Sequence, residues 1–137
     1  SNIDSIFLVA PTTTEKRVKS ILKMTSGYVY YISLKGVTGA SITDAQEVER
    51  NVSALRSSTN LPIVVGFGVK DGKSAKEMSQ ASDGVIVGSA LVRKIASLNT
   101  QKSIDKEDIS RCTAIIGMIR SELDSDNELN SALKEYE

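Results

Sequence analysis

Residues 27–40, with the sequence GYVYYISLKGVTGA, decide the fold expected for this chain. They open with Gly27 and a run of aromatic and β-branched residues, which predicts a buried strand. The run gives way to the loop Lys35-Gly36-Val37-Thr38-Gly39, and a helix is expected directly after it. A strand that leads through a glycine-rich loop to a helix start is typical of phosphate binding in α/β proteins, because backbone N–H groups converge there.

The same pattern recurs along the chain. Apolar runs that end in Pro11 or contain glycine are found at residues 3–10, 63–69 and 85–92, and each predicts a strand that is covered on both faces. Segments with helical spacing of apolar residues follow each of them. The resulting order is βαβαβαβα, which predicts an α/β fold with parallel strands and right-handed crossovers.

Helix starts and the carboxyl-terminal tail follow from local signals. A capping box predicts that Thr12 caps the first helix, and Ser74 is expected to cap the third. In the tail, residues 104–123 predict a long amphipathic helix, and Asp126 is expected to cap a separate last helix. The predicted organisation is four βα units in residues 1–97, with carboxyl-terminal helices in residues 98–137 that pack on the same domain.

Composition excludes several classes of function. Lysine and arginine balance aspartate and glutamate at 17 each, so we expect no nucleic-acid surface and no polybasic membrane signal. No apolar run approaches the ~20 residues of a membrane span, and the chain starts without a secretory signal pattern. A single cysteine suits a reducing compartment, so the predicted location is cytoplasmic.

The chain has no histidine, which removes several mechanisms. Ser-His-Asp and Cys-His catalysis are excluded within this chain, as are zinc sites with histidine ligands, and we expect no metal site. Any acid–base chemistry has to come from carboxylates, tyrosine or lysine.

Glycines stand at three of the four predicted strand ends. In parallel α/β folds, ligands bind at the carboxyl ends of the strands, where glycine lets the backbone approach an anion closely. Glycine also ends many strands for turn geometry alone, but its repetition in successive units favours phosphate binding. The residues concerned are Gly36, Gly39, Gly66, Gly68 and Gly88, the last followed by Ser89.

With these motifs the chain resembles the second half of the tryptophan synthase alpha chain, over residues 3–92. The similarity rests on residues 28–30 leading into Gly-Val-Thr-Gly at 36–39, on Gly-Phe-Gly at 66–68 and on Gly-Ser-Ala at 88–90. It implies strands five to eight of a TIM (βα)8 barrel, here a half barrel with carboxyl-terminal helices. The implied reaction, in tryptophan biosynthesis, is the retro-aldol cleavage of indole-3-glycerol phosphate to indole and glyceraldehyde 3-phosphate.

The resemblance also implies partners and residue roles. No cofactor is expected, and pyridoxal phosphate belongs to the partner beta chain, which receives the indole. Thr38 would help to close the site, Tyr30 would lie beside the substrate, and Tyr28 would support the pocket, although both tyrosines also fit ordinary core packing. The substrate phosphate would rest on backbone N–H groups at Gly39, Gly68, Gly88 and Ser89.

The family's two catalytic carboxylates belong to the half of the barrel that this chain does not resemble. Asp4, Asp71 and Asp83 fit turn or cap positions better than catalytic ones. We therefore expect a lyase fragment with no catalytic residue of its own, inactive or nearly so alone. It is expected to pair with the missing half or to self-associate, because a half barrel has two exposed strand edges.

Two alternatives stay open at this point. One is another phosphate-binding βα barrel of histidine or tryptophan biosynthesis, whose half barrels share the glycine-ended strands. The other is a non-catalytic phosphate-binding half-barrel module.

Overall fold

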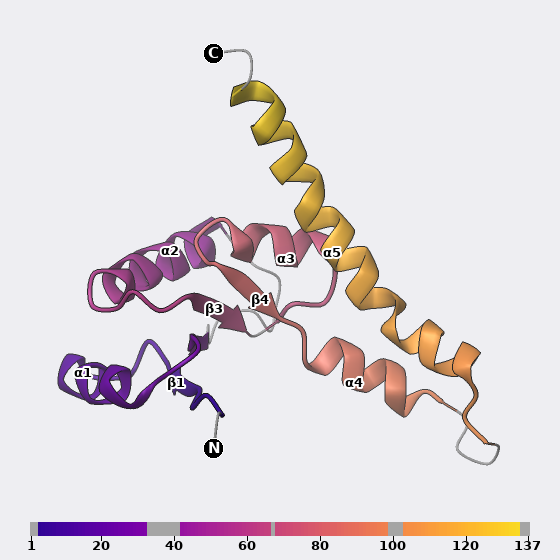
Figure 1. Ribbon diagram of the computed structural model, residues 1–137, viewed down its shortest axis with the longest axis horizontal. Coiled ribbons are helices and arrows are strands. Elements are labelled where there is room, and N and C mark those ends of the chain that lie inside the picture. Colours follow the sequence, from indigo (N-terminus) through magenta and orange to yellow (C-terminus); the bar gives the residue numbers. More distant parts are fainter. Residues whose placement is uncertain (1–2, 33–41, 67, 99–102, 135–137) are drawn as a thin grey trace.

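The computed structural model describes residues 3–32, 42–66, 68–98 and 103–134. Within them, strands and helices alternate along the chain before two helices end it (Figure 1). The elements are β1 (Phe7–Val9), α1 (Glu15–Met24), β2 (Val29–Ile32), α2 (Ile42–Arg56), β3 (Ile63–Gly66), α3 (Gly72–Ser79), β4 (Gly84–Ile86), α4 (Ser89–Ala96) and α5 (Lys106–Lys134).

The four strands form one sheet in the order β1-β2-β3-β4, and every neighbouring pair is parallel. Val29 of β2 lies opposite Phe7 and Ile63, and Ile32 at the end of β2 lies opposite Gly66. Strand order therefore equals chain order, as successive βα units require when each crossover moves one strand along the sheet. The predicted α/β fold with a parallel sheet is confirmed.

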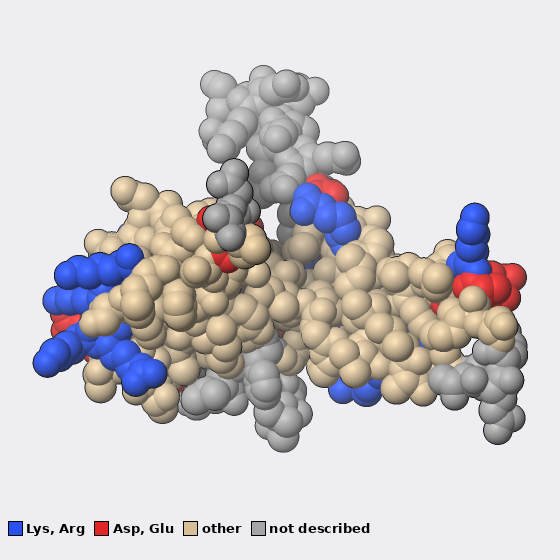
Figure 2. Space-filling model, turned by 60° about the horizontal axis from the view of Figure 1, so that its bottom comes forward, with Lys and Arg blue, Asp and Glu red and all other residues tan. Residues whose placement is uncertain are grey.

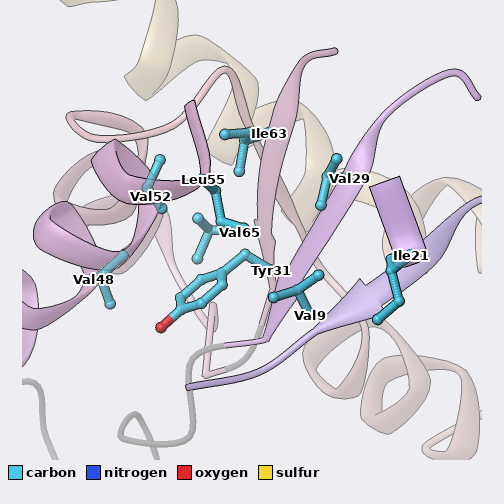
Figure 3. Packing of buried hydrophobic residues seen from close by; sticks show 9 residues of the cluster. All are labelled: Val9, Ile21, Val29, Tyr31, Val48, Val52, Leu55, Ile63 and Val65. Atoms are coloured by element: carbon cyan, nitrogen blue, oxygen red, sulfur yellow. The ribbon is translucent and has the colours of Figure 1, made fainter. Parts of the chain in front are cut away.

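One face of the sheet carries the main core (Figure 3). Alternate strand residues point into it because successive side chains in a strand face opposite ways. Tyr31 is 1% exposed and Val65 is fully buried. Figure 3 shows Tyr31 reaching toward Val48 of α2. The buried members from strands and helices are Val9, Ile21, Val29, Tyr31, Val48, Val52, Leu55, Ile63 and Val65.

The opposite face of the sheet is less covered. Leu8 is 52% exposed, and Tyr30 and Val64 are only half-buried. These residues alternate with the buried ones along the same strands, so they share the second face. The helices that follow β1 and β2 thus cover one side of the sheet, as in the outer layer of a βα barrel.

A second apolar cluster joins α5 to α3 and to the chain around β4, and Figure 1 shows α5 running beside α3. Its buried residues are Val69, Ala75 and Ile119. Partly buried apolar residues pack against it, among them Val85 of β4, Val87 just after β4 and Ile115 of α5. The carboxyl-terminal helix is thereby joined to the last two βα units.

The amino edge of the sheet is held by a carboxylate. Asp83, just before β4, accepts a hydrogen bond of 2.8 Å from the Ile63 N–H and pairs with Arg56 at 3.1 Å. The bond from Ile63, followed by that from Arg56, lowers the pKa of Asp83 below its ordinary value. This contact joins the end of α2 and the starts of β3 and β4.

Two helix starts differ from the sequence prediction. Helix α1 begins at Glu15 after Thr14, without a side-chain cap, while the Thr13 hydroxyl accepts a bond of 3.0 Å from the Ala10 N–H. The prediction of Thr12 as the cap was therefore wrong. The Thr13 hydroxyl instead binds the backbone just after β1, because threonine side chains form hydrogen bonds in turns as readily as at helix caps.

Helix α3 begins two residues before Ser74, with Asp71 as its cap. Asp71 accepts a bond of 2.8 Å from the Ser74 N–H, and the Ser74 hydroxyl in turn lies near the Asp71 N–H. The bond from the Ser74 N–H lowers the pKa of Asp71. Ser74 is thus the inner member of the capping box rather than the cap.

The tail forms one continuous helix instead of two. Helix α5 runs through Asp126, where a new helix start was expected. Residues 118–134 contain neither glycine nor proline, so nothing interrupts the backbone hydrogen bonds there. An aspartate caps a helix only where its own backbone is outside the helical conformation.

The surface charge is uneven. Figure 2 shows lysine and arginine side chains gathered at the end of the molecule where α1 lies, and a broad uncharged area beside them. Lys16, Arg17, Lys19 and Lys23 are all exposed there, and Lys19 pairs with Glu15 at 2.7 Å.

Among the described residues, no helix is long and apolar enough to cross a membrane.

Candidate functional site

The carboxyl ends of the four strands define one edge of the sheet, because all four run in the same direction. The chain leaves this edge after Val9, Ile32, Gly66 and Ile86. Loops at the carboxyl edge of a parallel sheet are where ligands bind in α/β folds. The candidate residues are therefore best judged by their distance from this edge.

Tyr30 reaches the carboxyl edge from the middle of β2. Its backbone lies opposite Val64, but its ring extends along β3 to Gly66. A β-carbon added at Gly66 would lie 2.2 Å from the Tyr30 hydroxyl oxygen and 2.6 Å from its Cζ. The ring thus occupies the space that a side chain at Gly66 would need, on the sheet face opposite the main core. The neighbouring Tyr31 faces the other way. Its phenol lies in the main core, where burial raises its pKa.

Gly68 stands in the connection between β3 and α3. Its φ of 74° lies in the left-handed region, which favours glycine. The next residue, Val69, is 2% exposed, and Asp71 caps α3 three residues after Gly68. The buried Val69 and the helix cap Asp71 thus hold the chain that follows Gly68 against the fold.

Gly88 and Ser89 stand at the start of α4, two and three residues after β4 ends. Gly88 is the N-cap residue and makes no side-chain cap bond, and both residues are exposed. Among the described residues, no atom lies within 4 Å of a β-carbon added at Gly88, so they leave the space beside this helix start open. The first N–H groups of a helix carry a partial positive charge and favour an anion.

Other candidates lie elsewhere. Tyr28 precedes β2 and so lies at the amino edge, half-buried, on the same face as Tyr30 but farther from the carboxyl edge. Thr38 and Gly39 lie outside the described residues, so their predicted roles stay predictions. The roles of Tyr28, Tyr30, Gly68, Gly88 and Ser89 in binding also stay predictions.

Two of the carboxylates named from the sequence serve local structure. Asp71 caps α3, and Asp83 holds the amino edge through Ile63 and Arg56. Within the part of the chain that the structure describes, no three His, Cys, Asp or Glu side chains are grouped so as to hold a metal ion.

The contact between Tyr30 and Gly66 is the feature that sequence reasoning missed. Gly66 was noted only as one glycine at a strand end, whereas the structure shows that its missing side chain makes room for the tyrosine. The only signal in the sequence is a tyrosine and a glycine on successive predicted strands, and it gives no register between them.

A model of the tryptophan synthase alpha chain family matches residues 1–119 of the 137-residue chain. The chain belongs to this family. The tryptophan synthase alpha chain of Chromobacterium violaceum is 47% identical over 112 residues, covering 82% of this chain and 42% of that relative. The alpha chain of Nitrosococcus oceani is 40% identical over 123 residues, covering 90% of this chain and 44% of that relative.

Solved structures of tryptophan synthase alpha subunits share the fold. The subunit from Legionella pneumophila has a TM-score of 0.71 at 29% identity, covering 90% of this chain and 43% of that one. The subunit from Campylobacter jejuni has a TM-score of 0.69 at 34% identity, covering 86% and 44%. The βα units are thus those of a TIM barrel, and the chain spans less than half the length of these relatives.

Proposed function

We propose that this chain supplies the phosphate-binding part of a tryptophan synthase alpha chain that acts in tryptophan biosynthesis. The proposed reaction is the retro-aldol cleavage of indole-3-glycerol phosphate to indole and glyceraldehyde 3-phosphate. Membership of the family across residues 1–119 is the observation that carries the proposal. The partner that receives the indole would be the tryptophan synthase beta chain, with pyridoxal phosphate on that chain and no organic cofactor or metal on this one.

The substrate phosphate would rest on backbone N–H groups of Gly68, Gly88 and Ser89, together with Gly39. Two features of the described residues support this role. The start of α4 has no side-chain cap, and the space beside Gly88 is open. An anion in that space would satisfy N–H groups that lack partners within the helix.

Tyr30 would lie beside the reacting part of the substrate. Thr38 would help to close the site, and Tyr28 would support the pocket from the side of the amino edge. The ring of Tyr30 over Gly66 supports the first role, because it brings the phenol to the carboxyl edge where β3 ends. This ring lies on the sheet face away from the main core, as the inner face of a barrel requires.

The chain alone is expected to be inactive or nearly so. Cleavage needs an acid and a base that move the indole proton and the glycerol hydroxyl proton, and each positioned group contributes roughly a hundredfold or more. Asp71 and Asp83 already accept bonds from Ser74 and from Ile63 with Arg56, so they are poorly placed for that work. The catalytic carboxylates would come from the other half of the barrel.

The test is indole release from indole-3-glycerol phosphate, by this chain alone and mixed with the amino-terminal half of the Chromobacterium violaceum relative. Release only in the mixture would support the proposal. Binding of the substrate without release in either sample would instead support a non-catalytic module, and no binding would refute the proposal.

A pair of variants locates the phosphate. Gly88→Asp adds a carboxylate beside the helix start, where a β-carbon meets nothing, and aspartate is itself a favourable cap that should leave folding intact. In the mixture with the amino-terminal half, repulsion of the substrate phosphate should raise KM by at least about tenfold, equivalent to 1.4 kcal/mol. Gly88→Ala is the matched control, with the same added carbon and no charge. Equal KM values for the two variants would place the phosphate elsewhere.

A further inference from the structure

Two valines join the candidate phosphate segments to one apolar cluster. Val69 directly follows Gly68 and is 2% exposed, and Val87 directly precedes Gly88 and packs against the same cluster. The buried residues of this cluster are Val69, Ala75 and Ile119 of α5, and Ile119 is 3% exposed. Residues next to both segments therefore belong to, or pack against, one cluster that includes a residue of α5.

Helix α5 also contacts the two helices that follow these segments. Near its start, the Cys112 Sγ lies 3.4 Å from the Lys94 carbonyl oxygen of α4. Farther along, a β-carbon at Gly72, the first residue of α3, would lie 3.0 Å from both Cβ and Cγ of Glu122. The backbone of α3 and the side chain of Glu122 thus approach as closely as a glycine allows. Figure 1 shows α5 running past both α4 and α3.

We propose that α5 sets the separation between the Gly68 and Gly88 segments, so that phosphate binding and the docking of α5 are coupled. The inference rests on the proposed phosphate site. An anion held by both segments needs them at one spacing, and Val69 and Val87 transmit that spacing from Ile119. Ile119 is in this view a positioning residue, because it belongs to the cluster that contains Val69 and against which Val87 packs, and not to the candidate site itself.

The coupling has a calculable size. If phosphate binds only the form with α5 docked, it adds RT ln(1 + [L]/Kd) to the free energy of undocking. At a phosphate concentration ten times Kd, undocking of α5 becomes about tenfold rarer. By linkage, the apparent Kd rises as the fraction of molecules with α5 docked falls, so a change that leaves about one fifth of them docked weakens phosphate binding about fivefold.

The first experiment uses the unaltered chain and inorganic phosphate, with ionic strength held constant by chloride. Amide hydrogen exchange is followed with and without phosphate at ten times the measured Kd. Amides of α5 between Cys112 and Ile119 should exchange about tenfold more slowly, while those of α1, which packs on β1, should change less than about twofold. An equal slowing of α1 and α5 would overturn the inference, as would binding that leaves α5 unchanged.

The second experiment compares neighbouring substitutions on α5. Ile119→Ala removes buried contacts, whereas Met118→Ala removes a side chain that is 72% exposed. Ile119→Ala should weaken phosphate binding by at least about fivefold, and Met118→Ala by less than about twofold. Equal Kd values would overturn the inference and leave the phosphate site standing. If phosphate does not bind the unaltered chain, the proposed site fails and this inference fails with it. Should Ile119→Ala fail to fold, the exchange measurement decides alone.

Discussion

Gly66→Ala would drive a methyl group into the ring of Tyr30. The added carbon would lie 2.2 Å from the hydroxyl oxygen, 2.6 Å from Cζ and 3.0 Å from Cε1. Favourable contacts between heavy atoms lie near about 3.5–4.0 Å, so the ring has to move by more than about 1 Å. Gly66 lies opposite Ile32 in the paired strands, which hold its backbone in place. The tyrosine therefore takes most of the displacement.

The cost follows from two opposing terms. Forcing an extra carbon into a packed site costs about 1–3 kcal/mol. Alanine restricts the unfolded chain more than glycine does, which returns about 0.4–1 kcal/mol where the backbone is compatible. We expect Gly66→Ala to lower the free energy of unfolding by about 1–2 kcal/mol, a fall in Tm of about 4–8 °C.

Urea unfolding of the four chains of a double-mutant cycle tests the reasoning. Tyr30→Leu removes the three ring atoms nearest the new methyl group, so Gly66→Ala should cost at least about 1 kcal/mol less in that background. Tyr30→Phe is the finer control, because it removes the hydroxyl but leaves Cζ 2.6 Å away. It should therefore rescue only part of the loss. Additive effects of Gly66→Ala and Tyr30→Leu would refute the explanation.

Two further predictions concern stability. Gly117→Ala, inside α5 where a β-carbon meets nothing within 4 Å, should raise the free energy of unfolding by about 0.5–1 kcal/mol, seen as a higher urea midpoint with an unchanged slope. Asp83 has a folded-state pKa lowered from 3.8, so its stabilising contribution is complete above that pH and disappears as the pH falls through the folded-state pKa. Asp83→Asn should therefore lose less stability between pH 7 and pH 3 than the unaltered chain, and an equal loss would contradict the assigned role of this carboxylate.

The four βα units could be predicted because their signals are local. Ile63-Val64-Val65-Gly66 is a short apolar run after a proline, and such a run has few conformations that bury it. Helix boundaries were harder to predict than the units themselves, because Thr13 and Asp71 compete with their neighbours for the same backbone N–H groups. The sequence did not predict an unbroken α5, because Asp126 fits the N-cap of a new helix although the helical backbone continues through it.

The candidate site was predictable in part for a similar reason. Parallel strands bring their carboxyl ends to one edge, so Gly68 and Gly88 could be placed there from order alone. The contact of Tyr30 with Gly66 depends on the register between β2 and β3, which periodicity does not specify. The packing of Val69 and Ile119 joins residues fifty positions apart, and only the folded chain brings them together.

The uniform direction of the strands separates two kinds of selection pressure on this chain. Residues that hold the sheet together through Asp83 lie at one rim, and the glycines proposed to grip an anion lie at the other. A lineage can therefore change the loops around Gly68 and Gly88, and with them the ligand, without disturbing the opposite rim. An engineer who wants a different anion at this edge has the same freedom, provided that the valines beside those glycines are kept.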